Sequence, residues 1–125
     1  SKNIDDPVLT FSGVTDHGKP QLQLQWWSEV DEGRVFLADW ENCKGKWLIC
    51  ECKTNYAKSG SILFSIRSLD STLNIKKELK NVQTWRDGFE FVRPKWGIYR
   101  SLAKEKKKLT PQDQIWMNNF SIRKI

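Results

Sequence analysis

Metal-binding residues are scarce in this sequence. It has one histidine, His17, and three cysteines, Cys43, Cys50 and Cys52, among 125 residues. The cysteines lack the spacing of a zinc site, and the histidine lies far from them in the sequence. We therefore expect no metal site, and nothing in the sequence indicates a cofactor.

Long apolar runs are also missing. No segment approaches the roughly 18 consecutive apolar residues that a membrane-spanning helix needs, so we expect no membrane insertion. No signal peptide stands at the start, and the first residue is Ser1 rather than methionine. This is consistent with a trimmed N-terminus, and we expect a secreted or extracellular protein.

The three cysteines leave their redox state open. Cys50 and Cys52 fall on the same face of an expected strand, which favours packing over a bond between them. A disulfide from Cys43 to one of these two would leave the third thiol free or paired with another chain. Three reduced, partly buried thiols are the equal alternative.

Basic residues outnumber acidic ones. Twenty-one Lys and Arg residues stand against fifteen Asp and Glu residues, which gives a formal net charge of +6. Such a balance favours an anionic partner: a polyuronate, a sulfated glycan, a nucleic acid or a membrane surface. The sequence has no RNP-like aromatic strand, helix-turn-helix or zinc finger, so binding to nucleic acid or to a membrane surface ranks last.

Short, regularly spaced strand patterns predict an all-β fold. The expected strands cover residues 21–26, 34–38, 46–54, 61–67, 89–92, 96–100 and 115–122. Residues 73–85 fit either a strand followed by a loop or one to two helical turns. At 125 residues the chain is one domain by length, and the strand spacing favours a sandwich or barrel.

Two strand patterns also predict which side chains are buried. Residues 21–26 alternate polar and apolar side chains without a fault. This pattern places Leu22, Leu24 and Trp26 inward and Gln21, Gln23 and Gln25 outward. In the second strand of the expected hairpin, the buried face carries Ile62, Phe64 and Ile66.

Residues 93–100 combine basic and aromatic side chains in the order Arg-Pro-Lys-Trp-Gly-Ile-Tyr-Arg. In a strand, Lys95, Gly97 and Tyr99 would line one face, and the glycine would leave room for a ligand against the backbone. A lysine beside a phenol suits an acidic sugar, because the cation neutralises a carboxylate and the phenol can transfer a proton. A strand with a packed Tyr99 and a solvated Lys95 is the simpler alternative.

This stretch resembles the near-C-terminal motif of jelly-roll polysaccharide lyases, a lysine–x–glycine–x–tyrosine strand that carries the catalytic tyrosine. The resemblance is to the heparin lyase I-like and glucuronan lyase-like group of the concanavalin A-like sandwiches. Residues 45–47 with the strand that follows, residues 58–66 and residues 113–122 resemble further parts of the same domain. The resemblance covers roughly residues 8–125 of this chain, but only about the C-terminal half of such a family domain.

The resemblance implies a jelly-roll β-sandwich and roles for several residues. Tyr99 matches the catalytic tyrosine, and Lys95 matches the lysine of the same motif. The neighbouring Arg93 and Arg100 are candidate substrate-binding cations. A tyrosine can serve as base and acid when such cations stabilise its phenolate.

The family pattern is incomplete in this chain. Residues 8–13 should align with a glutamine–histidine strand but contain neither residue type. His17 follows in a turn-like segment and is the remaining candidate for catalysis, and the family's arginine–glutamate motif would lie before Ser1. The strands are also few for a full jelly roll, so either the sandwich is reduced or a second chain, such as another copy, completes it.

Exposed aromatic rings would extend a sugar-binding face, because they stack on the apolar faces of pyranose rings. The candidates are Trp27, Trp40 and Trp96, together with the outward amides of Gln23 and Gln25. Trp26, Trp47 and Trp116 fall in apolar phase and are expected in the core.

These features together predict a carbohydrate-binding β-sandwich that recognises an acidic polysaccharide. The first alternative is an active lyase that cleaves a uronate-containing glycan by β-elimination, with Tyr99 as acid and base. A secreted interaction protein or toxin on the same scaffold is the further alternative.

Overall fold

The computed structural model describes residues 7–27, 32–95 and 116–124. Tyr99, Arg100 and Trp96 therefore lie outside the described residues. The chain divides into two units, residues 1–90 and residues 91–125, and each is described by itself.

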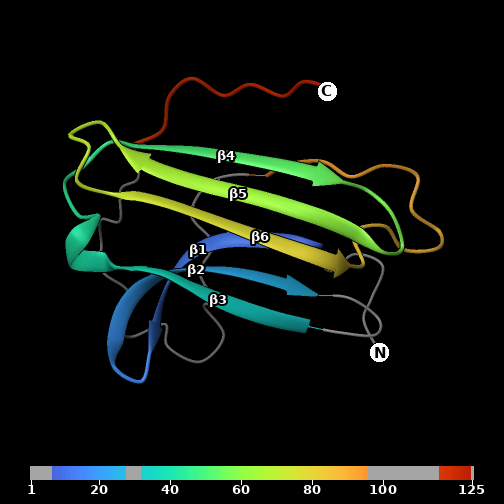
Figure 1. The fold of residues 1–125 in the computed structure, drawn as a ribbon, viewed down its shortest axis with the longest axis horizontal. Coiled ribbons are helices and arrows are strands. Elements are labelled where there is room, and N and C mark those ends of the chain that lie inside the picture. Colours follow the sequence, from blue (N-terminus) through green and yellow to red (C-terminus); the bar gives the residue numbers. More distant parts are fainter. Residues whose placement is uncertain (1–6, 28–31, 96–115, 125) are drawn as a thin grey trace, which may run out of the picture. The chain divides into compact units, whose positions relative to one another are not determined.

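The described residues of the first unit form six antiparallel strands in two sheets (Figure 1). One sheet has the order β1-β2-β3 and the other the order β4-β5-β6, so each is a meander of three consecutive strands. A short 3-10 helix, η1, follows β3. The elements are β1 (Leu9–Asp16), β2 (Lys19–Trp27), β3 (Glu32–Asp39), η1 (Trp40–Asn42), β4 (Leu48–Asn55), β5 (Gly60–Ser68) and β6 (Asn74–Val82). The predicted all-β class is confirmed.

The turn between β1 and β2 has a local cause. His17 and Gly18 are the two residues between the paired ends of these strands, and both have positive φ, 50° and 77°. Two left-handed residues in a two-residue loop match the right-handed twist of the strands they join. The predicted turn at His17 is therefore confirmed.

The hairpin of β4 and β5 is also confirmed, and Thr84 fastens its loop. The Thr84 hydroxyl donates to Asn55 O at 2.7 Å and accepts from Ala57 N at 2.9 Å. A Cβ on Gly60 would overlap Asn55 O and Thr84 Oγ1, so this position has room for glycine alone. A residue after β6 thus closes a loop that lies 27 positions earlier in the chain.

The core lies between the two sheets. Leu22 and Leu24 of β2 pack in one cluster with Phe64 and Ile66 of β5, and the Phe11 and Phe64 rings lie 5.0 Å apart. Ile62, Phe64 and Ile66 are 1%, 3% and 0% exposed, which confirms the predicted buried face of β5. Burial of each such side chain contributes about 1.5–3 kcal/mol.

A buried arginine joins the segment after β6 to the end of β2. Arg86 is 1% exposed, and its Nη2 donates to Trp27 O at 2.8 Å and to Pro7 O at 3.4 Å. Its guanidinium carbon also lies 5.4 Å from the centre of the Phe89 ring. Carbonyl oxygens and a ring face thus compensate for burying this cation. No pattern in the sequence had singled out Arg86.

Several sequence predictions need correction. Residues 89–92 and 116–122 form no strand, whereas at residues 73–85 the expected strand followed by a loop is confirmed as β6. Trp47 and Trp116 were expected in the core but are 50% and 76% exposed. Trp47 precedes β4 instead of lying within it, so strand alternation does not govern its direction.

The described part of the second unit, residues 91–95 and 116–124, has no helix or strand. Arg93 is exposed, and its guanidinium carbon lies 6.0 Å from the centre of the Phe91 ring. Among all described residues, no helix is both long and apolar enough to cross a membrane.

Candidate functional site

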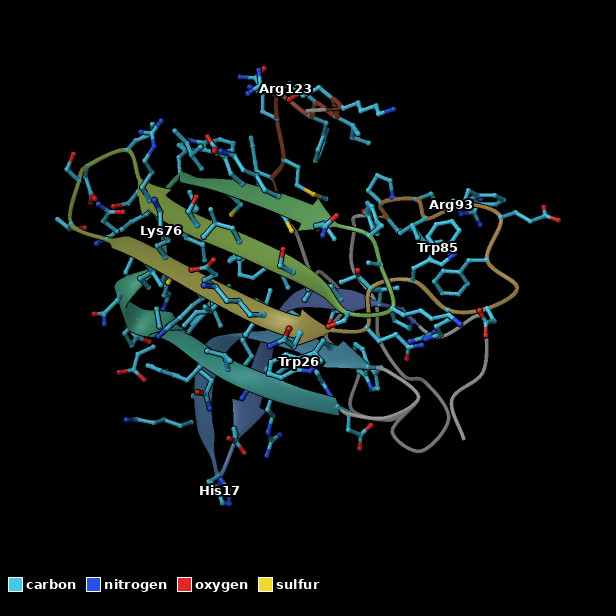
Figure 2. The ribbon with its side chains drawn as sticks, turned by 45° about the vertical axis from the view of Figure 1, so that its right-hand side comes forward. His17, Trp26, Lys76, Trp85, Arg93 and Arg123 are labelled. Atoms are coloured by element: carbon cyan, nitrogen blue, oxygen red, sulfur yellow. The ribbon has the colours of Figure 1, made fainter. Side chains whose placement is uncertain are left out.

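Within the described part of the first unit, the site residues predicted from the sequence do not form one cluster. His17 stands at the tip of the β1–β2 hairpin (Figure 2), with its side chain 91% exposed and its Nδ1 3.0 Å from Asp16 Oδ1. Trp27 is half-buried at the other end of β2, about 26 Å from the hairpin at the usual rise per residue. Because β2 holds them so far apart, these two residues cannot contact one sugar ring together.

Trp40 is the predicted aromatic residue that borders a hollow. Its ring is 42% exposed and lies against Gly13, where an added Cβ would stand 3.6 Å from Cζ3. The hollow has a volume of about 380 Å³ and is open to solvent. Its lining residues are Gly13, Val14, Thr15, Pro20, Gln21 and Trp40. Trp40 therefore remains a candidate for ring stacking.

Lys95 and Arg93 are exposed residues of the second unit. The strand that would place Lys95 and Tyr99 on one face falls outside the described residues. The catalytic roles of Lys95, Tyr99 and His17 and the binding roles of Arg100 and Trp96 therefore stay predictions.

The outer side of the first sheet carries a row of glutamines, which we call the glutamine face. Its middle strand contributes Gln21, Gln23 and Gln25, and the directly paired neighbours on the same side are Thr10, Ser12, Val14, Arg34, Phe36 and Asp39. The alternation of β2 is as predicted, because Leu22 and Leu24 join the core on the other side. The pattern of faces was thus read correctly from the sequence.

The exposure expected for the glutamines is wrong for two of them. Gln21 is 7% exposed and Gln23 is 3% exposed, whereas Gln25 is half-buried. Gln23 lies between Ser12 of β1 and Phe36 of β3, so strands on both sides shield its side chain. Alternation predicts the face of a side chain but not how far its neighbours cover it.

The outer side of the second sheet is different and is called here the lysine face. Its side chains fall in four rows across the strands: Ile49–Arg67–Asn74, Glu51–Ser65–Lys76, Lys53–Leu63–Glu78 and Asn55–Ser61–Lys80. Long charged side chains on β4 and β6 therefore flank the shorter Ser61, Leu63 and Ser65 of β5. This arrangement makes a shallow trough along β5.

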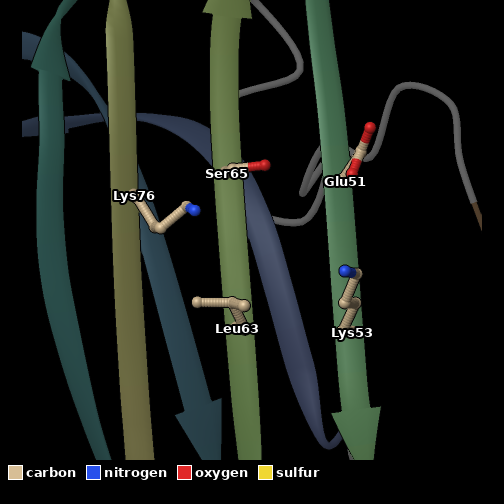
Figure 3. A pocket seen from close by; sticks show the side chains of 5 residues that line it. All are labelled: Glu51, Lys53, Leu63, Ser65 and Lys76. Carbon is tan, nitrogen blue, oxygen red and sulfur yellow. The ribbon is translucent and has the colours of Figure 1, made fainter.

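The centre of this trough is a small hollow (Figure 3). It has a volume of about 50 Å³ and is lined by Glu51, Lys53, Leu63, Ser65 and Lys76. Figure 3 shows the Lys76 amine turned over the sheet toward Ser65, with Lys53 on the opposite strand. The hollow has room for one small anionic group, but it does not enclose a substrate away from water.

Most cations of the lysine face have no carboxylate partner. The face carries Lys53, Arg67, Lys76 and Lys80 against Glu51 and Glu78. Lys80 lies 3.9 Å from Glu78. Among the described residues, Lys53, Arg67 and Lys76 form no ion pair. Three exposed positive charges are therefore free to meet an anionic ligand.

All three cysteines are free thiols. Cys43 is buried in the core, while Cys50 and Cys52 lie on the inward side of β4 but are exposed, because β4 is an edge strand. Although the Cys50 side chain reaches solvent, nearby sheet atoms desolvate its thiol enough to raise its pKa to about 11. None of these thiols is an activated nucleophile near neutral pH. The described residues also contain no group of three or more His, Cys, Asp or Glu side chains that could hold a metal ion.

Sequence reasoning missed the lysine face, although its signal was present. In β6, Lys76, Glu78 and Lys80 alternate with Ile75 and Leu79, which is a half-buried strand pattern. The same period occurs in β4 at Glu51 and Lys53. What the sequence did not show is that these strands flank β5 and bring their charges onto one surface.

Comparison with known proteins adds no relative. No protein-family model matches the chain, and neither the curated proteins nor the solved structures that were searched contain a match.

Proposed function

We propose that this chain is a carbohydrate-binding β-sandwich that recognises an acidic polysaccharide on the lysine face. The observation that carries this proposal is the set of three unpaired, exposed cations, Lys53, Arg67 and Lys76, around the trough of β5. The face has a surplus of positive charge, so an anionic chain lying in the trough gains electrostatic attraction.

The shape of the face supports an extended ligand. Residues 61–67 of β5 span about 20 Å at the usual rise per residue. A polymer chain can therefore lie along β5 and meet cations on both sides. Carboxylate or sulfate groups would approach the lysine amines, and the Ser65 hydroxyl beneath them can donate a hydrogen bond.

A polysaccharide fits this face better than a nucleic acid. Proteins that hold single strands stack bases on aromatic side chains. None of the twelve residues of the lysine face, as given in its four rows, is aromatic. The cations of the lysine face can attract anionic groups on a flexible chain. The serines of its middle strand, β5, can hydrogen-bond to sugar hydroxyl groups.

The test is a binding panel with immobilised polyuronates, sulfated glycans, a neutral glucan and single-stranded DNA. The key variant is Lys53→Gln/Lys76→Gln. Its control is Lys44→Gln/Lys58→Gln, which removes the same formal charge at exposed positions off the face. Lys44 forms no ion pair with a described residue, whereas Lys58 Nζ lies 3.0 Å from Asp87 Oδ1, so the control also releases one carboxylate. Exposed ion pairs contribute about 0.7 kcal/mol each, so losing two should weaken binding about tenfold.

The outcomes separate a defined site from general charge attraction. We expect the Lys53/Lys76 variant to lose affinity for one acidic glycan and the control to keep most of it. Equal losses in both variants would show that net charge alone drives binding. Ultraviolet absorbance of the same mixtures reports unsaturated uronate ends, and a rising signal would replace a pure binding function with lyase activity.

A further inference from the structure

Two amides of the glutamine face are buried without a protein partner. Gln21 and Gln23 are more than nine-tenths buried, yet neither side chain hydrogen-bonds to any other described residue. Buried amides in folded proteins nearly always have a partner from protein, water or ligand. The polar side-chain atoms that are fully enclosed and lack a partner do not include those of Gln21 and Gln23, so both amides keep a small contact with solvent.

The part of the glutamine face that lies on β1 is also partly buried. On β1, Thr10, Ser12, Val14 and Asp16 share the side of the glutamines and are half-buried. Phe11, Gly13 and Thr15 point to the other side of the same strand and are exposed. The glutamine face is therefore the more protected side of this edge strand, although it lies away from the core.

The side chains around Gln23 suit a ring that carries hydroxyl groups. An amide offers two donors and an acceptor oxygen, and successive amides on one strand face lie about 6.7 Å apart. Phe36 lies directly opposite Gln23 on β3 and is 50% exposed, while Ser12 lies opposite on β1. A sugar ring could stack its apolar face on Phe36 and direct its hydroxyls to the amides.

The charges at the border of this face are already paired. Arg34 Nη2 lies 3.9 Å from Asp16 Oδ1, and Lys19 Nζ lies 3.7 Å from Asp39 Oδ1. This contrasts with the unpaired cations of the lysine face. A ligand without charge therefore fits the glutamine face better than an acidic one.

We propose that the glutamine face is a second carbohydrate site, which binds a neutral glycan segment through Gln21, Gln23 and Phe36. This proposal goes beyond acidic-polysaccharide binding, because the second site lies on the β1-β2-β3 sheet and binds through amides and an aromatic ring instead of through cations. The core separates the two outer faces, so both sites can be occupied at once.

The experiment titrates the full chain with neutral oligosaccharides of glucose, mannose, galactose and xylose by calorimetry, at low salt and at about 0.5 M salt. Gln23→Leu removes the amide and keeps a buried side chain of similar size. Phe36→Leu removes the ring at an exposed position, where the fold tolerates change. The Lys53→Gln/Lys76→Gln variant is the matched control for the other face.

We expect at least one neutral glycan to bind, with about tenfold weaker binding in Gln23→Leu and in Phe36→Leu and little effect of salt. The lysine control should bind the same glycan as the wild type does. Absence of binding at millimolar glycan, or unchanged affinity in Phe36→Leu with its fold intact, would overturn the proposal. Neither result concerns the binding of acidic polymers. The proposal for the glutamine face can therefore fail while the proposal for the lysine face stands, and the reverse.

Discussion

The two outer faces of this sandwich are built from the same strand alternation but have opposite physical character. On the glutamine face, uncharged amides are buried and have no partner among the described residues. On the lysine face, charged side chains are exposed and three of them have no counter-ion there. Buried amides give directional hydrogen bonds that salt hardly affects, whereas exposed cations give attraction that salt screens. One fold can thus present two kinds of recognition.

The largest expected difference concerns the introduction of a carboxylate on each face. Gln23→Glu places a charge at a position that is 3% exposed, and the fold should lose roughly 3 kcal/mol at pH 7. Asn55→Asp is the matched change on the lysine face, where the residue is exposed, and should cost less than about 0.5 kcal/mol. Urea unfolding of both variants measures the contrast.

The loss in Gln23→Glu should also depend on pH. Burial raises the pKa of the introduced carboxyl in the folded state above its unfolded value. The destabilisation is therefore complete above the folded pKa and shrinks as the pH falls toward the unfolded value, about 4.3. If Gln23→Glu and Asn55→Asp lost equal stability at pH 7, the two faces would not differ in burial.

An intermediate effect is expected from the packing that supports the glutamine-bearing sheet. Trp26 lies across Gly33, its direct partner on β3, and a Cβ there would overlap the Cζ2 atom of the ring. Gly33→Ala should therefore cost about 1–3 kcal/mol, because the indole must move. Gly13→Ala is the control, since its Cβ would meet Trp40 at an ordinary 3.6 Å. Equal urea midpoints for the two variants would contradict this role of Gly33.

The smallest effect is expected in the loop that joins β5 to β6 in the lysine-bearing sheet. Asp70 accepts hydrogen bonds from Ser68 Oγ and Thr72 Oγ1, both at 2.6 Å, and from Thr72 N at 3.0 Å. These bonds, with Lys46 nearby, hold the pKa of the Asp70 carboxyl well below its usual range. The β1–β2 turn instead depends on the backbone conformation of His17 and Gly18.

Because the folded pKa of Asp70 is depressed, its stabilisation is present above the unfolded pKa, about 3.9, and is lost as the pH falls below it. Asp70→Asn should therefore flatten the stability curve between roughly pH 4 and pH 2. Thermal unfolding across this range provides the measurement. An unchanged slope in the variant would show that other carboxylates cause the acid sensitivity.

Sequence patterns along the chain predicted the buried face of β5 and the turn between β1 and β2, but they did not predict the lysine face. The alternation of Ile62, Phe64 and Ile66 gave the buried face of β5 because strand period is a property of the backbone. The positive φ values at His17 and Gly18 follow from a turn-forming composition in the same way. Residues 89–92 misled the prediction, because Phe89 packs against the Trp85 ring and the Arg86 guanidinium without belonging to a strand.

The sequence by itself determined the all-β class, the hairpin of β4 and β5, the turn at His17 and the faces of β2 and β5. These features depend on neighbours along the chain, through backbone sterics and side-chain period. Only the tertiary structure decided that Gln23 is buried, that Trp47 is exposed and that Lys53 and Lys76 flank one trough. Burial and charge clustering depend on which strands become neighbours in space, and no local pattern in the chain encodes that choice.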